Sequence, residues 1–357
     1  MSEGLNRRDF LVRGAVAGAG ILGAGWLASC ARSAVSTAAS ASQTLTGALA
    51  DTAQAPVAQE AVAVKSRVGL YTNEGLMDAD TVPNLEKVLA MLDRGMMYVF
   101  GADSPETAWK QVASPQDVVA LKVNCICRHL STNPVVSYAI AQRLMDVGLP
   151  PQNIIIFDRT SRELTNAGYE LVKSGTAKPY CYGTDGDYGE EFTYETFSGK
   201  LSNILLQKAT VLINVPVLKT HGASQVTIAL KNHFGTVHNP GACHRNIDMT
   251  IPSISATEPI KTKTRLAILD ATRACFAGGP SPPPASMWTF KGVAVASDPV
   301  ALDFVGNRIV NNKRTSENMG PISKNPEGVA THLLNAARMG LGKASEGEID
   351  LVHEQLT

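Results

Sequence analysis

The sequence predicts an α/β fold in which helices flank a largely parallel sheet within one main domain, residues 67–357. Short apolar runs of strand length alternate here with segments of helical periodicity. The connections between the runs are long enough to hold crossover helices. The composition agrees, because 44% hydrophobic and 18% charged residues supply a globular core.

The first strand–helix–strand unit has the clearest signals. Residues 117–123 form an apolar run bounded by polar residues, which is typical of a buried strand. Helix-capping residues then precede Pro134, and the periodic segment ends at Gly148. A second apolar run, 153–157, follows. The order predicts a parallel βαβ unit with a right-handed crossover.

Three later runs, 210–217, 266–269 and 293–296, also have strand character. The last leads through Asp298, a good N-cap residue, into an apolar-periodic helix. Between the first two, Ser224 is placed to cap a helix that runs to Asn232. We therefore expect a sheet whose strands alternate with helices as far as the C-terminal part of the chain.

Residues 1–30 resemble a twin-arginine lipoprotein signal peptide. Arg7 and Arg8 precede an uncharged, glycine-rich segment that is short for a membrane-spanning helix. Leu-Ala-Ser-Cys, ending at Cys30, resembles the lipobox in which that cysteine is lipidated. The alternatives are an uncleaved anchor and an ordinary signal peptide cut near Ala28.

The segment 31–66 is rich in Ala, Ser and Thr and predicts a flexible tether. The expected protein is therefore exported by the twin-arginine machinery and held by a lipid on the periplasmic side of a membrane. With 32 basic and 32 acidic residues the chain has no net charge, and no basic stripe is present. Nucleic acid is therefore not an expected partner.

Polar residues follow each predicted strand. Ligands of open α/β sheets bind beyond the carboxyl ends of the strands, so these side chains are expected to surround one crevice. The expected ligand-binding residues are Lys122, Asn124, Asn214, Asn232, Asp270 and Asp298. Asp158 is a candidate catalytic residue. Each also has an ordinary explanation, such as a helix cap or a solvated surface position.

The densest segment, 215–244, contains four of the seven histidines. Lys219 and Lys231 suit an anionic ligand, and with His221 they are further catalytic candidates. Imidazole and thiolate groups also suit a divalent or transition metal, for which the candidate ligands are His221, His233, His244 and Cys243. Their spacing matches no established zinc or iron motif.

Cys125 and Cys127 lie directly beyond the first strand. In an extended segment, residues two apart point the same way, so the two thiolates could share a metal. The alternatives are two packed thiols or a disulfide with another segment. The sequence leaves these open.

Several motifs resemble those of the domain of unknown function 362 family. They are L-K-V-N (121–124), N-V-P-V-L-K-T-H-G (214–222), L-K-N-H-F-G (230–235), I-L-D-A-T-R-A-C-F-A-G-G-P (268–280) and A-S-D-P-V-A-L-D (296–303). The resemblance spans roughly residues 66–345 and implies an α/β domain without settling a reaction. Many relatives carry ferredoxin-type cysteine clusters. This sequence has no C-x2-C-x2-C run, which argues against a ferredoxin-type [4Fe–4S] module.

The leading expectation for function is a metal-assisted or redox enzyme acting on a small anionic substrate. A first alternative is a non-catalytic periplasmic lipoprotein that binds an anion or assists assembly. A second is nickel-dependent, racemase-like chemistry, suggested loosely by Asp158-Arg-Thr160 and the Lys/His cluster.

Overall fold

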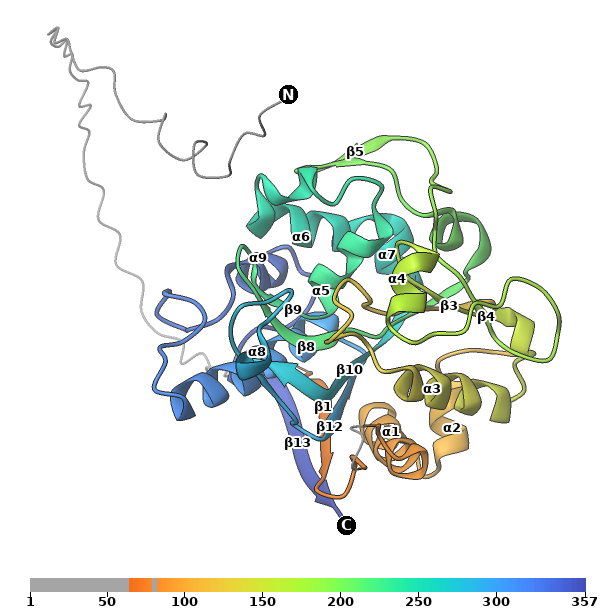
Figure 1. Cartoon of the computed structure of the whole chain (residues 1–357), viewed down its shortest axis with the longest axis horizontal. Helices are drawn as coiled ribbons and strands as arrows, with labels where there is room; N and C mark the ends of the chain where they lie inside the picture. Colours follow the sequence, from red (N-terminus) through yellow and green to blue (C-terminus); the bar gives the residue numbers. More distant parts are fainter. Residues whose placement is uncertain (1–63, 79–81) are drawn as a thin grey trace, which may run out of the picture. The chain divides into compact units, whose positions relative to one another are not determined.

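A mixed β-sheet forms the centre of the folded part of the chain, and helices lie on both of its faces (Figure 1). The computed structural model describes residues 64–78 and 82–357, which belong to one compact unit. The predicted signal peptide, Cys30 and tether residues 31–63 lie outside the described residues. Predictions about export and lipidation are therefore not addressed by the structure.

The main path of the sheet has eight strands in the described ranges. They are β1 (Ser66–Asn73), β2 (Val119–Lys122), β3 (Ile154–Phe157), β4 (Tyr180–Cys181), β7 (Val211–Asn214), β10 (Thr264–Cys275), β12 (Gly292–Ala296) and β13 (Ile349–Leu356). Their order across the sheet is β13-β1-β12-β10-β7-β2-β3-β4.

Short strands extend or accompany this path. β8 (Val217–His221) and β11 (Met287–Trp288) pair with β10, and β9 (Gln225–Thr227) pairs with β8. β5 (Phe192–Tyr194) and β6 (Phe197–Gly199) form a separate hairpin. β8 runs parallel to β10 and antiparallel to β9. The β8–β9 hairpin therefore projects beyond the end of β7.

Five of the seven neighbouring pairs on the path are parallel, which confirms the α/β class with a largely parallel sheet. β12 is the exception, because it runs antiparallel to both β1 and β10. Its carboxyl end therefore faces the edge opposite to the ends of β2, β3 and β7. Asp298, which follows β12, belongs to that opposite edge.

Helices cover both faces of the sheet. They are α1 (Leu85–Phe100), α2 (Pro105–Lys110), α3 (Pro134–Asp146), α4 (Ser161–Asn166), α5 (Ala229–Asn232), α6 (Ile247–Ala256), α7 (Glu258–Lys263), α8 (Pro299–Ser316) and α9 (Thr331–Arg338). Alternate residues of β2 enter different cores. Leu121 packs in the cluster that contains α1, α2 and α3, whereas Ala120 packs in the cluster that contains α5–α9. Burial on both faces explains why the central strands are continuously apolar.

The predicted βαβ unit is formed by β2, α3 and β3. Asn133 caps α3 by accepting a hydrogen bond from the backbone N–H of Val135. Pro134 occupies the first helical turn, where its missing N–H has no consequence. Gly148 adopts φ +100° just after the helix, a conformation that favours glycine. Local chemistry therefore sets both ends of this helix.

Two predicted elements differ from the observed ones. The strand expected over 210–217 divides into β7 and β8 around Pro216, which has no N–H for a sheet ladder. The helix expected from Ser224 begins only at Ala229, because Gln225–Thr227 pairs with β8 instead. Asp303 accepts hydrogen bonds from the N–H groups of Ala229 and Leu230 at 2.6 and 3.0 Å, which defines the start of α5.

Among the residues described, none of the helices combines the length and apolar character that crossing a membrane requires.

Candidate functional site

A cavity of about 290 Å³ lies beyond the carboxyl ends of β2 and β3, between β8, α5 and the loops that follow them. Its lining residues are Lys122, Asn124, Ile126, Asp158, Arg159, Glu163, His221, Thr227, Lys231, Asn232, Phe234, Gly235, Pro240, Gly241, His244 and Pro280. The position is the one expected for a ligand site in an open α/β sheet.

A buried ion pair forms one wall of the cavity. Lys122 Nζ lies 2.7 Å from Asp158 Oδ1, and both side chains are almost completely buried. Asp158 also accepts hydrogen bonds from the backbone N–H groups of Cys125 and Arg159, at 2.6 and 2.8 Å. Because three donors meet its two oxygens, Asp158 holds the ends of β2 and β3 together.

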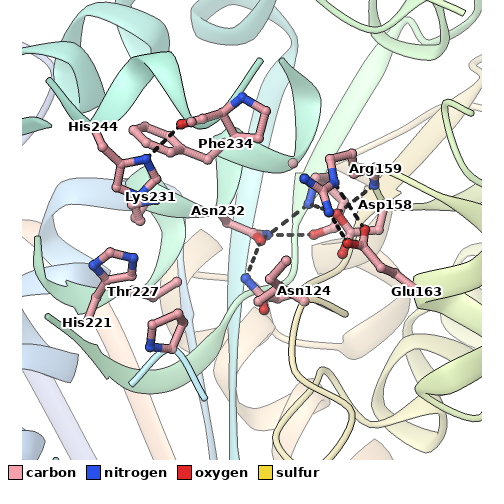
Figure 2. A pocket seen from close by; sticks show the side chains of 16 residues that line it. Asn124, Asp158, Arg159, Glu163, His221, Thr227, Lys231, Asn232, Phe234 and His244 are labelled. Carbon is pink, nitrogen blue, oxygen red and sulfur yellow. Dashed lines mark hydrogen bonds and ion pairs between the residues drawn. The ribbon is translucent and has the colours of Figure 1, made fainter. Parts of the chain in front are cut away.

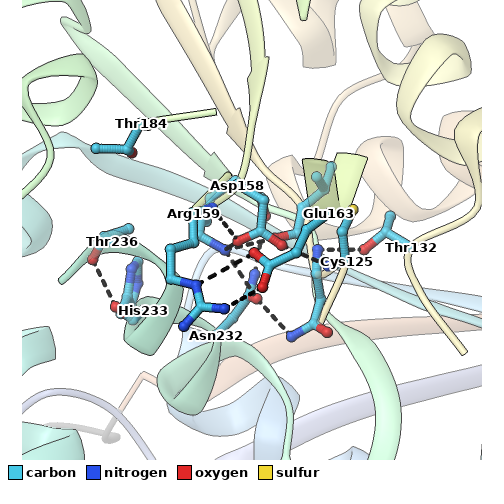
Figure 3. Close-up of polar contacts among 12 residues, drawn as sticks. Cys125, Thr132, Asp158, Arg159, Glu163, Thr184, Asn232, His233 and Thr236 are labelled. Carbon is cyan, nitrogen blue, oxygen red and sulfur yellow. Dashed lines mark hydrogen bonds and ion pairs between the residues drawn. The ribbon is translucent and has the colours of Figure 1, made fainter. Parts of the chain in front are cut away.

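Asn232 is the centre of a buried amide network (Figure 3). Its Oδ1 accepts from Asn124 Nδ2 at 2.9 Å, and Lys122 Nζ lies 3.4 Å away. Its Nδ2 donates to Asn214 Oδ1 at 2.8 Å and to the carbonyl of Lys122 at 3.0 Å. One side chain of α5 thereby joins the ends of β2 and β7.

Lys219 lies behind this network and is fully buried. Its Nζ donates to Asn124 Oδ1 at 2.6 Å and to the carbonyl of Leu130 at 3.3 Å. Burial lowers the pKa of this ammonium group to about 8. Lys219 therefore supports Asn124 from behind and does not line the cavity.

Arg159 and Glu163 form a second ion pair at the cavity, one helical turn apart at the start of α4. The Arg159 Nε and Nη2 atoms both face the Glu163 carboxylate. This bond raises the pKa of the guanidinium. The cavity's second acidic group is therefore also neutralised by a neighbour.

Lys231 differs from these cations. It is 6% exposed, lines the cavity, and places Nζ 3.3 Å from the centroid of the Phe234 ring. In the described part of the chain its ammonium group has no hydrogen-bond or ion-pair partner. Burial lowers its pKa to about 7; nearby Cys243 opposes this and Lys219 adds to it.

His221 and His244 stack beside Lys231, with ring centroids 5.5 Å apart (Figure 2). His221 Nδ1 accepts hydrogen bonds from the N–H groups of Ala223 and Ser224, at 3.0 and 3.2 Å. The proton of the neutral ring is therefore on Nε2. His244 Nδ1 lies 2.7 Å from the carbonyl of Pro240, which can only accept.

The two imidazoles are therefore complementary tautomers. His221 offers an Nε2–H donor, and His244 offers an unprotonated Nε2 acceptor. Burial, followed by the charge of Lys231, lowers the pKa of both rings, that of His221 to about 3. Both are neutral near pH 7. A proton donor, a proton acceptor and a cation thus occupy one end of the cavity.

A family model described as a domain of unknown function (DUF362) matches residues 119–308, which is more than half of the chain. The chain belongs to the DUF362 family. The match contains every lining residue of the cavity.

No curated protein matches the chain. A protein from Thermotoga maritima, known from its crystal structure, is similar with 10% sequence identity and a TM-score of 0.34. The similarity covers 66% of this chain and 60% of that chain.

In this DUF362 protein, most of the residues predicted from the strand ends meet at one place. Lys122, Asn124, Asp158, His221, Lys231 and Asn232 line the cavity. Asn214 and Lys219 lie directly behind them and hydrogen bond to Asn232 and Asn124. Figure 2 shows His221, Lys231 and His244 on one side, Asp158, Arg159 and Glu163 on the other, and Asn124 and Asn232 between them.

The four candidate metal ligands do not form one cluster. His233 is buried against Asn214, with its Nε2 3.1 Å from Asn214 Nδ2. Cys243 Sγ contacts the carbonyl of Asn239 at 3.5 Å. Within residues 64–78 and 82–357, no three His, Cys, Asp or Glu side chains are grouped to hold a metal ion. Of the four, only His221 and His244 face the cavity.

Two predicted ligand-binding residues lie elsewhere. Asp270 is inside β10, where it accepts hydrogen bonds from the N–H groups of Asn133 and Thr272 at 2.7 and 2.9 Å. Asp270 does not lie at a strand end, because β10 continues to Cys275. Through its hydrogen bond with Asn133, the N-cap residue of α3, it supports the start of that helix. Asp298 caps α8 at the opposite edge, because β12 is antiparallel to its neighbours.

The two cysteines after β2 do not face the cavity as a pair. Cys125 and Cys127 are buried free thiols, whereas Ile126 between them is 48% exposed and lines the cavity. The expectation placed the two cysteines toward the cavity, but it is the residue between them, Ile126, that faces it. Of the alternatives left open, the structure shows two packed thiols.

Sequence reasoning did not assign Glu163 or Phe234 to the site, and it noted Arg159 only as part of the segment Asp158-Arg-Thr160. The signals were local ones. Arg159 and Glu163 are four residues apart at a helix start, and Lys231 and Phe234 are three apart, both spacings that bring side chains together.

Proposed function

We propose that this cavity is the active site of an enzyme that transfers protons to and from a small anionic substrate. The observation that carries the proposal is the grouping of Lys231, His221 and His244. The ammonium group has no counter-charge among the described residues, and the two imidazoles present opposite proton-transfer roles.

The charges around the cavity favour one anionic group. Lys122 is neutralised by Asp158, and Arg159 by Glu163. Lys231 remains as the excess positive charge. A carboxylate or similar anion beside it would compensate that charge and restore the pKa of the lysine toward its ordinary value.

Proton transfer follows from the tautomers. His244 Nε2 is free to accept a proton from a substrate carbon or hydroxyl group, and His221 Nε2–H is free to donate one to a developing oxyanion. Neutral rings are required for both roles, and the lowered pKa values keep them neutral near pH 7. Lys231 would hold the anion in register between them.

The proposal can be tested without knowledge of the natural substrate. Small carboxylic acids incubated with the protein in deuterated water should lose the NMR signal of an exchangeable C–H proton. His244→Asn should retain ligand binding, measured by calorimetry, and lose exchange by a factor of about 10²–10⁴. Lys231→Met should lose binding. His129→Asn, at an exposed histidine outside the cavity, is the matched control and should change neither.

If the wild-type protein binds carboxylic acids but catalyses no exchange, the result would contradict an enzyme and support an anion-binding lipoprotein. The metal-assisted or redox form of the proposal has its own measurement. A stoichiometric metal in protein purified after export, lost in His221→Ala, would assign the histidine pair to metal binding instead of direct proton transfer.

We further propose that the protein is exported by the twin-arginine route and anchored by a lipid on Cys30. The support is the sequence of residues 1–30, which lie outside the described residues. Arg7→Lys with Arg8→Lys should leave the precursor in the cytoplasm. Cys30→Ala should release the mature protein from the membrane fraction. Normal export of the first variant, or membrane retention of the second, would contradict the respective half of the proposal.

A further inference from the structure

Lys231 has an amine whose surroundings differ from those of the other two buried lysines at the site. Lys122 and Lys219 each donate hydrogen bonds to named oxygens. Lys231 Nζ instead lies over the Phe234 ring at the cavity, and no described residue accepts a hydrogen bond from it. Its lone pair, once the amine is deprotonated, is not obstructed by a protein partner.

The groups facing this amine come from several elements. β8 contributes Lys219 and His221, the turn Ala242–His244 contributes Cys243 and His244, and α9 contributes the buried His332. Cys243 is the only one of these that favours the protonated amine. Burial in this setting lowers the pKa of Lys231 to about 7. A larger fraction of this amine is therefore free at pH 7 than in an ordinary lysine.

We propose that Lys231 forms a reversible protonated imine with the carbonyl group of a small oxo acid bound in the cavity. This inference rests on the proposed function, since it places a carbonyl compound in the same site, and it names the substrate class. A desolvated lysine near a second cationic group is the setting in which lysine acts as a nucleophile.

The chemistry balances without an oxidant. Lys231 Nζ forms a bond to the carbonyl carbon, and the oxyanion that develops accepts a hydrogen bond from His221 Nε2–H. His244 Nε2 takes a proton from the nitrogen and returns it to that oxygen, which gives the neutral carbinolamine. His244, protonated from solvent, then delivers a proton to the hydroxyl group as the C–O bond breaks. Water leaves, and the nitrogen remains as a cationic imine.

The carboxylate of an oxo acid suits this product. The imine keeps the positive charge of the lysine, so the adjacent carboxylate compensates the excess charge of the cavity. The Phe234 ring covers the nitrogen as it covers the ammonium group. A cavity of about 290 Å³ limits the substrate to a small molecule.

The test is reductive trapping. The purified protein is incubated at pH 7 with pyruvate and cyanoborohydride, and modified lysines are located by peptide mass spectrometry. Lys231 should be modified at least about a hundredfold faster than any exposed lysine, because binding in the cavity would hold the carbonyl group beside this amine. Lys231→Arg keeps the cation without the nucleophile, so it should abolish this modification. Lys208→Arg is the matched control, because Lys208 lies over the Tyr182 ring at an exposed position.

Lactate separates this inference from the proposed function, because it carries the same carboxylate without a carbonyl group. If lactate binds to the wild type and to Lys231→Arg, and only the wild type traps pyruvate, both proposals are supported. If lactate binds but trapping is equal at all lysines, the imine is excluded and the anion site remains. If neither compound binds or is trapped, both proposals fail. Circular dichroism spectra matching the wild type establish that each variant is folded.

Discussion

The two sides of the cavity differ in whether their polar and charged groups have partners within the protein. On one side Lys122, Asp158 and Asn232 make hydrogen bonds with nearly all of their polar atoms, and Arg159 is paired with Glu163. On the other side, Lys231 has no polar partner in the described residues, and each histidine keeps one ring nitrogen free. Lys231 is buried like most groups of the first side, whereas His221 is only partly buried and His244 is exposed.

The side with Lys122, Asp158 and Asn232, whose polar atoms are nearly all hydrogen bonded, has the properties of a scaffold. A buried charge or amide whose partners are all protein groups gains little from a ligand, and it defines the relative positions of β2, β3, β7 and α5. The side with Lys231, His221 and His244 retains polar groups that are free to contact a substrate. The comparison assigns position to the first side and chemistry to the second, and it predicts opposite effects of mutation on the two.

The largest effect is expected at the scaffold. Lys122→Met removes the partner of Asp158 and leaves a buried carboxylate without its cation. It should lower the free energy of unfolding by about 3–5 kcal/mol, measured by urea titration. Lys110→Met breaks the exposed pair with Glu106 and should leave stability nearly unchanged. Similar effects of the two variants would show that the buried pair is not a structural requirement.

On the side with Lys231, a mutation should change the free energy of unfolding in the opposite direction. Lys231→Met removes a buried cation that lacks a partner, so the variant should be more stable than the wild type near pH 6. The folded-state pKa of about 7 lies below the ordinary value of 10.5. The unfolded chain therefore binds more protons between these pH values, and wild-type stability rises as pH increases through the window.

The advantage of Lys231→Met should accordingly shrink by up to about 1.4 kcal/mol for each pH unit from 7 toward 10. Its ceiling at low pH is roughly 5 kcal/mol, from which the lost contact with Phe234 subtracts about 0.5–2 kcal/mol. Unfolding curves of both proteins from pH 6 to pH 10 measure the difference. A difference independent of pH would mean that Lys231 is not desolvated in the folded protein.

Much of the scaffold could be predicted from the sequence. The caps of α3 and the apolar runs of β2 and β3 are local signals, and parallel strands bring Lys122, Asn124 and Asp158 to one edge. The position of Lys231 in the cavity was also anticipated, although the helix expected from Ser224 begins only at Ala229. The hairpin of β8 and β9 brings α5 to the site instead.

The chemistry of the site was less accessible. The tautomers of His221 and His244 depend on backbone groups of a turn and of Pro240, and no sequence pattern specifies these contacts. The lack of a partner for Lys231 is a property of the packed chain as well. Metal ligation was inferred from residue types within a short segment, but the fold places His233 away from the cavity, against Asn214.

A smaller effect is expected where the backbone approaches the scaffold. A Cβ atom on Gly235 would overlap Asp158 Oδ1 and Lys122 Nζ, so Gly235→Ala should lower stability by about 1–3 kcal/mol. Gly241 lines the same cavity, but its Cβ would meet only Asn239 Oδ1 at 3.4 Å. Gly241→Ala should therefore be close to neutral. Equal stability of the two variants would indicate that the buried pair can move without loss.

The smallest effect on ligand binding is expected at the edge opposite the cavity, and it tests strand direction. Asp298 accepts hydrogen bonds from the N–H groups of Val300, Ala301 and Lys343, at 2.8, 3.0 and 2.9 Å. Asp298→Ala removes a helix cap and two further contacts, with the N–H of Lys343 and with Ser66 Oγ, which together should lower stability by about 2 kcal/mol. Asn84→Ala, which removes the cap of α1, should cost about 1 kcal/mol.

Neither cap variant should alter carboxylate binding in the cavity, measured by calorimetry below the melting temperature of each protein. Asp298 follows an antiparallel strand and therefore faces the edge away from Lys122 and Lys231. This separates the two readings of its motif, Ala-Ser-Asp-Pro, as a cap or as part of a ligand site. A loss of binding in Asp298→Ala but not in Asn84→Ala, with both proteins fully folded at the temperature of the measurement, would mean that the two edges of the sheet are coupled. Asp298 would then belong to the ligand site as well as to the helix cap.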